Sequence, residues 1–598
     1  MPNAEQILMS SALLEIPKNT KFLSDMGKHL VELERKLQQH GFFQDAQSAA
    51  LLPARESSTF FTQCIQAMET EFEADLNAYS TMRWIYYLRR IPNVFFDGRL
   101  SSTGANTRVL AEVYANRSQA AEPAAFGPSG FVFPTDGGTL EHIARLMAFT
   151  VIVSDLQLGF RLASKGFDYR FGNDGRKALR GRLLAGAVFA PLTNVPSPLP
   201  RPVLNPTLAA ALRLYDQRHN YMADTFLSIA MGQVGLARGL ADVDAERMVD
   251  ISRAFWGLHE DRKFSPQELL KGHPNAAIYE DDVKVLIRFG PADLDLTRLF
   301  ELYRLPAMAG NAIDSNSSLC LISVMLGGHL LKTRRFSCLR VMEVGYFIVD
   351  PSEWAEAGEK EYANVCDEIR LHLPQFQAPN DFAAFSRSCL AFKGEVWPLA
   401  HGAPVKITGD YVCIDMWAAS MGFLAWLQFP RIQGHVANAR AIKFEDLVQD
   451  VIDQSRWADR SSRALRQKTL NLNGRALTDI DAIGAYNGTI LLVSCKSIPY
   501  TREYDQGAHN AIRNAASTVD RGVDYWSGIV DQLNAQRVGD NFDLSGFTQI
   551  VGVVCTPFVV YTSHSRSVER SIGRLRWSSS LDELLEFLTT CADSDAQE

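Results

Sequence analysis

Helical spacing of apolar residues dominates most of the chain before residue 435. Residues 3 to 90 show this spacing, for example at Leu30, Leu33 and Leu37, with charged residues on the opposite side. Residues 137 to 190 also have a mostly helical pattern. The pattern predicts two further helices and one strand, at residues 207–215, 244–258 and 339–349 respectively. The first 434 residues are therefore expected to be mainly α-helical.

The pattern changes in the last third of the chain, where strand-like runs alternate with helical ones. We expect helices at residues 444–454, 504–536 and 581–590, and strands near 466–472, within 478–496, and at 547–560. This order predicts a C-terminal α/β domain with an αβββαβ core.

A proline-rich segment divides the helical region. Residues 191–206 contain six prolines, which cannot continue a helix or fill a central strand. With 598 residues the chain is too long for a single core. We therefore expect a helical domain at 1–190, a linker at 191–206, a mainly helical middle domain at 207–434 and an α/β domain at 435–598.

Composition indicates a soluble, reduced protein. The nine cysteines lie singly, without a CxxC pair, which favours free thiols over disulfides or a zinc ribbon. The N-terminus has no basic stretch followed by an apolar run, so we expect a cytoplasmic protein without a signal peptide. The apolar runs 318–331 and 411–429 are interpreted as buried helices, and no membrane partner is expected. The net charge of −8 means that nucleic-acid binding would require a local basic patch.

The most informative segment is residues 478–496, which has the pattern of a β-hairpin. Asn487-Gly488 is a preferred two-residue type I′ turn. Pairing back from this turn places Asp481 opposite Ser494 and Asp479 opposite Lys496. Two carboxylates, a hydroxyl and an ammonium group are thus expected on one face, where they would suit a divalent metal and a phosphate. For Asp479 a structural role, as a simple cross-strand ion pair to Lys496, is favoured over a direct role at the site.

This hairpin resembles the PD-(D/E)xK nuclease superfamily, whose second strand ends in Glu-x-Lys. Thr478-Asp479-Ile480-Asp481 is similar to the first strand and Val493-Ser494-Cys495-Lys496 to the second, with Ser494 in the place of the glutamate. The resemblance covers residues 436 to 598. It implies a restriction-endonuclease-like fold and metal-dependent hydrolysis of nucleic acid, with DNA as the favoured substrate and Mg²⁺ or Mn²⁺ as cofactor.

The resemblance also implies roles for individual residues. Asp481 would bind the metal, Lys496 would orient the attacking water and stabilise the phosphate, and the backbone carbonyl of Cys495 would be a further ligand. The Cys495 side chain is expected to face the core. Glu445, on the preceding helix, would replace the missing glutamate; the simpler interpretation is an acid that complements the helix dipole.

A basic run and one amide are candidates for contacts to the nucleic acid. The run contains Arg460, Arg463, Arg466 and Lys468, and it would either follow a phosphate backbone or form an ordinary solvated surface. Gln506, after the lysine strand, is a candidate contact near the scissile bond.

Three functions remain open from the sequence. The first is a nuclease whose N-terminal region senses, regulates or binds a partner protein or a second copy, as in a prokaryotic defence effector. The second is a catalytically degenerate scaffold or nucleic-acid-binding subunit, with Ser494 marking lost activity. The third places an unrelated enzyme in residues 207–430, where no motif supports it.

Overall fold

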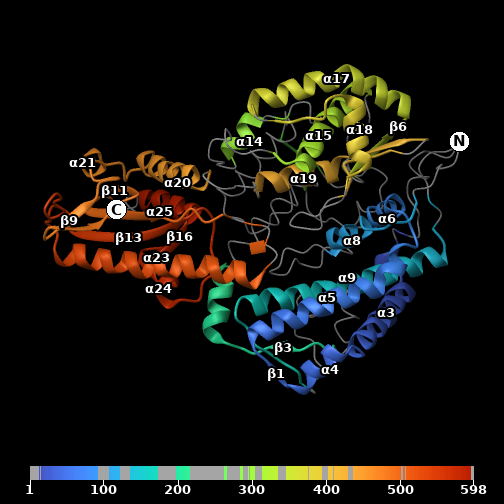
Figure 1. Ribbon diagram of the computed structural model, residues 1–598, viewed down its shortest axis with the longest axis horizontal. Helices are drawn as coiled ribbons and strands as arrows, with labels where there is room; N and C mark the ends of the chain where they lie inside the picture. The colour runs from blue at the N-terminus through green and yellow to red at the C-terminus, as the bar shows by residue number, and fades with distance from the viewer. Residues whose placement is uncertain are drawn as a thin grey trace. The chain divides into compact units, whose positions relative to one another are not determined.

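The computed structural model describes most of the chain, in segments. These are residues 13, 15–91, 107–121, 133, 135–172, 197–215, 261–264, 283–286, 294, 296–302, 313–334, 345–374, 376–392, 402–407, 410–428, 436–499, 501, 503–504 and 507–593. The described parts are rich in helix and contain several small sheets (Figure 1). The expected helix at 244–258 and the candidate residue Gln506 lie outside the described residues.

The chain forms two compact units. Residues 1–203 and 220–431 make up the first unit, and residues 204–219 and 432–598 the second. The sequence suggests separate N-terminal and middle domains, whereas the structure groups them into one unit. It also assigns the helix at 206–215 to the C-terminal unit, although this helix directly follows the proline-rich segment.

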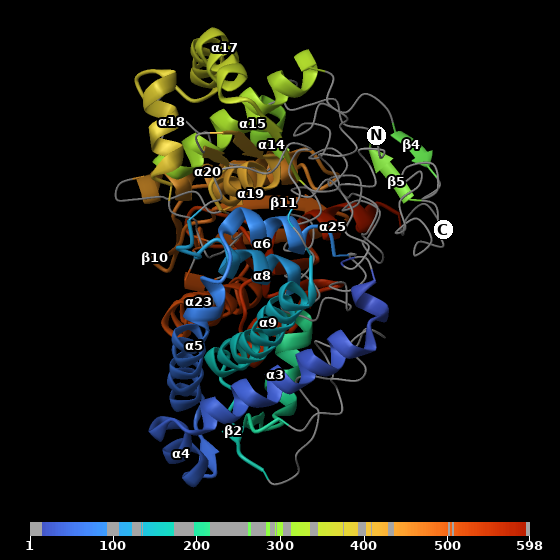
Figure 2. The same ribbon diagram turned by 90° about the vertical axis from the view of Figure 1, so that its right-hand side faces the viewer.

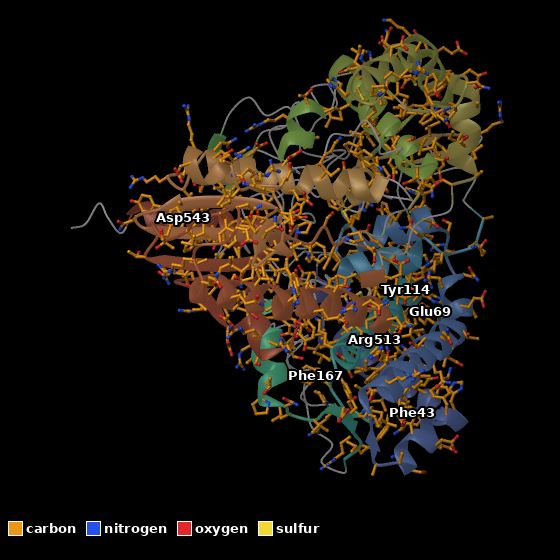
Figure 3. All side chains as sticks on the ribbon, turned by 60° about the vertical axis from the view of Figure 1, so that its left-hand side comes forward. Phe43, Glu69, Tyr114, Phe167, Arg513 and Asp543 are labelled. Carbon is orange, nitrogen blue, oxygen red and sulfur yellow. The ribbon has the colours of Figure 1, made fainter. Side chains whose placement is uncertain are left out.

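The N-terminal part of the first unit is helical. Its elements are η1 Ile16–Lys18, α3 Thr20–Gln38, α4 Gly41–Ser48, α5 Ala54–Leu76, α6 Thr81–Leu88, α8 Thr107–Ala115 and α9 Gly137–Ser164, with short strands β1 Leu51–Leu52, β2 Tyr169–Arg170 and β3 Arg201–Pro202. Helices α3, α5 and α9 pack side by side (Figure 2). Leu30, Leu33 and Leu37 are buried on α3, as their spacing predicts. Tyr114 of α8 donates a hydrogen bond to Glu69 of α5 at 2.9 Å (Figure 3).

Helix α9 is the one helix among the described residues that is long and apolar enough to cross a membrane. Within its most apolar window, 83% of the residues are buried inside the protein. A helix that is apolar on all sides is expected in the centre of a large core. The apolar run 411–429 is not the single buried helix that its composition predicts, because Val412–Asp415 form strand β8 before α19 Met416–Gln428 begins.

The rest of the first unit combines helices with small antiparallel sheets. It contains β4 Asp261–Phe264, β5 Val283–Leu286, α14 Leu296–Leu302, α15 Ser315–Arg334, β6 Tyr346–Val349, α17 Pro351–His372, α18 Phe382–Leu390 and β7 Val405–Ile407, besides β8 and α19. Strand β8 lies between β6 and β7.

A buried ionic cluster connects the two parts of the first unit. Arg89, which follows α6, donates to both carboxylate oxygens of Asp415 at 2.9 and 3.1 Å and also pairs with Glu112. The ammonium of Lys406 lies 3.4 Å from the same carboxylate, and the Asp415 carboxylate accepts the Ala418 N–H at the start of α19. Burial raises the pKa of Asp415, but Arg89 and Lys406 outweigh burial, so that the pKa is lowered.

The C-terminal unit is built on a four-stranded sheet. Its strands, in spatial order, are β11 Ala482–Tyr486, β12 Thr489–Cys495, β13 Gln549–Thr556 and β16 Ser578–Ser580. Strand β11 is antiparallel to β12, whereas β12, β13 and β16 are parallel. Helix α23 His509–Ala535 covers one face, and α20 Val436–Asp453 and α25 Leu581–Asp593 cover the other (Figure 1). The remaining elements are α21 Arg460–Arg463, β9 Leu470–Leu472, β10 Arg475–Thr478, α24 Ser565–Val568, β14 Arg570–Ile572 and β15 Leu575–Arg576.

One strand of the expected core lies elsewhere. Residues 466–472 were expected to supply the first strand of the main sheet, but β9 pairs with β10 in a separate two-stranded sheet. The local cause is a second Asn-Gly turn: Asn473 and Gly474 have φ values of 52° and 74°. Such a turn pairs the residues on either side of it with each other.

The helix at 206–215 packs into the core of the C-terminal unit. Ala211 and Tyr215 are buried with residues of α23 and of the segment after β13. The ring of Tyr215 makes an edge contact with Tyr561, with 5.8 Å between the ring centroids. The C-terminal unit therefore includes a helix that precedes its main segment by more than 200 residues.

Candidate active site

The predicted hairpin is present with the expected register. Asn487 and Gly488 have φ values of 45° and 75°, and the pairs run from Tyr486 with Thr489 to Ala482 with Val493. The carbonyl of Gly488 accepts hydrogen bonds from the backbone and the hydroxyl of Thr548, at 2.7 and 2.9 Å. These bonds fasten the hairpin tip to the chain that enters β13.

Asp481 lies beside Ser494, where β11 begins and β12 approaches its end. Its Oδ2 accepts the backbone N–H of Cys495 at 2.6 Å. Burial raises the pKa of Asp481, while this N–H, the Lys496 ammonium and the Ser494 hydroxyl act in the opposite direction. A partly buried carboxylate with a raised pKa gains more from a bound cation than a solvated one does.

The ammonium group of Lys496 lies next to Ser494, which neighbours Asp481. The Nζ of Lys496 donates to the Ser494 Oγ at 3.2 Å, and its backbone N–H donates to the Cys555 carbonyl at 2.8 Å. Its methylenes pass over Gly522 of α23, where a methyl group would come within 3.3 Å of the Lys496 Cε. Glycine at 522 thus leaves room for the lysine to lie along the helix.

Asp479 does not join this group as an ion-pair partner. The β11–β12 ladder ends at Ala482, and Asp479 is exposed in the segment before it. Among the described residues, no ion pair links Asp479 to Lys496. Its charge still acts on Asp481, whose pKa it raises slightly.

Glu445 comes to the site from α20. Burial and the charge of Asp481 raise its pKa, and Arg466 and Lys496 lower it. Glu445 on α20 thus interacts electrostatically with Asp481, which directly precedes β11, and with Lys496, which directly follows β12. The arrangement follows from the apolar positions Phe444 and Val448, which are buried against β12 and leave Glu445 at the border of the core.

Cys495 is a core residue, as its position in the strand predicts. It is 8% exposed and packs with Leu491 and Val493 on the α20 face of the sheet. Burial raises the pKa of its thiol well above the usual value. Any contribution to a metal site would therefore come from its backbone.

The residues of the basic run differ in their contacts, because three of them bond to other parts of the protein and one is exposed. Arg463 forms an ion pair with Asp453, Arg466 is bonded to Asp446, and Lys468 donates to the Asn541 carbonyl at 3.0 Å. Arg460 is exposed on α21, and among the described residues it has no ion pair. The run is thus not a uniform stripe of unpaired charges.

A divalent metal would find two carboxylates here, those of Asp481 and Glu445. No group of three or more His, Cys, Asp or Glu side chains in the described parts of the chain is arranged to hold a metal. Mg²⁺ commonly uses only one or two carboxylates and fills its remaining positions with water and substrate phosphate. The donor set therefore fits Mg²⁺ or Mn²⁺ and does not suit a closed structural metal site.

Sequence reasoning missed a buried glutamine next to the site. Gln449 of α20 is fully buried, and its amide exchanges two hydrogen bonds of 2.9 Å with the backbone of Ile483 in β11. The available signal was its position on the apolar side of the helix, between Val448 and Ile452. A polar residue at such a position needs buried partners.

Comparisons of the chain with protein-family models, curated proteins and solved structures find no match.

Proposed function

We propose that the C-terminal unit has a restriction-endonuclease-like fold and that the protein is a metal-dependent nuclease, with DNA as its favoured substrate. One observation carries the proposal. The hairpin register and two hydrogen bonds bring Asp481, Ser494 and Lys496 to one end of the hairpin, and α20 carries Glu445, whose pKa the Asp481 charge raises. Two carboxylates beside a lysine are the groups that metal-assisted phosphodiester hydrolysis requires.

Each residue has a definite role in this proposal. Asp481 and Glu445 bind Mg²⁺, and the carbonyl of Cys495 is a further candidate ligand. The bound metal would supply Lewis-acid activation of the phosphate. Lys496 orients the attacking water and stabilises negative charge on the phosphate, while Ser494 holds the ammonium of Lys496 in position.

Nucleic acid would reach the site along the neighbouring basic surface. Arg460 and Lys468 are exposed, and both lie between α20 and the hairpin in the chain. Phosphate contacts of this kind give affinity without sequence preference. The first unit, which contains most of the remaining chain, would regulate the nuclease or bind a partner, as in a defence effector of the cytoplasm.

Metal binding and cleavage test this proposal in one preparation. The full chain should bind Mn²⁺, and it should cut DNA in the presence of Mg²⁺ or Mn²⁺. Asp481→Asn and Lys496→Met should each abolish cleavage without unfolding the protein, because neither side chain fills the core. Equal cleavage by the wild type and both variants would place the chemistry elsewhere.

A second function is favoured by a specific contact. Oδ2 of Asp481 already accepts a backbone N–H, and a neutral hydroxyl occupies the position of the second carboxylate. Both features suit a nuclease fold that has become a nucleic-acid-binding or scaffolding subunit. This alternative predicts salt-sensitive nucleic-acid binding with no Mn²⁺ affinity, and Asp481→Asn should then leave binding unchanged.

A further inference from the structure

Strand β11 is an edge strand, yet three of its outward backbone groups, those of Ile483 and the N–H of Ala485, are occupied. The amide side chain of Gln449 pairs with both the N–H and the carbonyl of Ile483. The N–H of Ala485 donates to the Trp457 carbonyl at 2.9 Å. The Nε of Arg466 donates to the Asp481 carbonyl at 2.9 Å. An edge strand covered in this way is held in a fixed position relative to the elements that cover it.

Arg466 connects three parts of the candidate site. While its Nε binds the Asp481 carbonyl, its Nη2 donates to the carboxylate of Asp446 on α20 at 2.6 Å. Asp446 is the neighbour of Glu445 in the helix. The guanidinium also acts electrostatically on Glu445 itself. One side chain therefore links the backbone of one candidate ligand to the helical turn that carries the other.

We propose that Arg466 is a positioning residue, which holds the Glu445 turn of α20 against Asp481 so that both carboxylates can bind one metal ion. The inference rests on the proposed nuclease function. It differs from the role that the basic run suggests, in which Arg466 contacts a phosphate. The side chain of Arg466 is only 12% exposed, and its Nε and Nη2 groups have acceptors within the protein.

Helix α20 also carries a matched control for this ion pair. Arg463, three residues before Arg466, forms an ion pair with Asp453, which lies two helical turns after Asp446 on α20. Asp453→Asn therefore removes an ion pair between the same two segments without touching Glu445 or Asp481. Arg466→Gln removes the corresponding ion pair to Asp446 at the candidate site. Arg466→Lys keeps the positive charge but cannot donate hydrogen bonds to Asp481 and Asp446 in the same planar geometry.

The experiment compares these three variants with the wild type as full chains. The measurements are Mn²⁺ affinity, the melting temperature, and kcat and KM for DNA cleavage. We expect Arg466→Gln to weaken Mn²⁺ binding and lower kcat by about 10-fold or more, the usual effect of losing a group that orients a metal ligand. KM should change little. Arg466→Lys should recover part of both losses, and Asp453→Asn should match the wild type in Mn²⁺ affinity.

The outcomes separate the inference from the proposed function. Suppose that the wild type binds Mn²⁺ and cuts DNA, and that Arg466→Gln raises KM and reduces the salt dependence by about one unit of log–log slope with kcat unchanged. Arg466 is then a phosphate contact, and the positioning role is wrong. Equal Mn²⁺ affinities of Arg466→Gln and Asp453→Asn would also reject it. A wild type that neither binds Mn²⁺ nor cuts nucleic acid would overturn the proposed function and this inference together.

Discussion

Replacing Gln449 by leucine should loosen the hairpin from α20. Gln449 is fully buried, and leucine keeps much of its volume while removing both bonds to Ile483. The N–H and carbonyl of Ile483 would then be buried without partners. Each such group costs about 1–3 kcal/mol, so we expect a loss of about 2–4 kcal/mol after partial compensation by the apolar side chain.

Hydrogen exchange measures this loss where it occurs. A global unfolding curve of a chain with two compact units has no single free energy. Exchange of the Ile483 amide in the full chain reports the local opening instead. Since each 1.4 kcal/mol is a factor of ten, exchange should accelerate roughly 30- to 1000-fold. Peptides of β13 provide the internal reference.

Asp453→Asn is the control for this substitution. Gln449 also donates to the Asp453 carboxylate at 2.9 Å, and asparagine keeps an acceptor at that position. Exchange of Ile483 should therefore stay close to that of the wild type. If Gln449→Leu accelerates this exchange less than threefold, the amide pairing does not hold the edge of the sheet, and the account of how α20 is fixed is wrong.

Four further outcomes follow from the structure. Lys496→Met should keep the packing over Gly522 and the melting temperature but lose cleavage, as measured with a fluorescent DNA substrate. Ser494→Glu should restore part of the cleavage that Glu445→Ala removes, in the same assay. Asp415→Ala should destabilise the first unit by about 3–5 kcal/mol, because it leaves Arg89 buried without its main partner. Since the folded-state pKa of Asp415 is lowered, this stabilisation is present above the unfolded pKa of about 3.9 and is lost as the pH falls through the folded pKa. The urea midpoints of the wild type and the variant should therefore converge in acid. Tyr215→Ala should cost the C-terminal unit about 3 kcal/mol, seen as faster hydrogen exchange around Tyr561.

The sequence predicted those features that depend on neighbouring residues. The Asn487-Gly488 turn and the alternation of apolar residues determine the hairpin register, which agrees with the structure from Tyr486 to Ala482. The helices α20, α23 and α25 were likewise expected near their observed positions, because their apolar residues repeat with the helical period. The burial of Cys495 followed from the same alternation.

Features that depend on distant residues were missed. The contacts of Gln449 join residues 34 positions apart, and those of Arg466 join it to Asp446 and Asp481 at 20 and 15 positions. No periodicity identifies such partners. The placement of helix 206–215 in the C-terminal unit is a similar case. The pairing of β9 with β10 is different, because the Asn473-Gly474 turn that produces it is a local signal in the sequence.

The charges around the site offer a physical reason for serine at position 494. Asp481 already raises the pKa of Glu445, so the two carboxylates repel each other in the absence of a cation. A glutamate at 494 would add a third carboxylate to the same partly buried place, next to the ammonium that now bonds to the serine hydroxyl. Serine avoids that repulsion as long as Glu445 is held at the site by Arg466. The residue at position 494 and the two hydrogen bonds of Arg466 should therefore depend on each other. With an acid at 494, metal binding should depend less on Arg466. Without Arg466, an acid at 494 should improve metal binding.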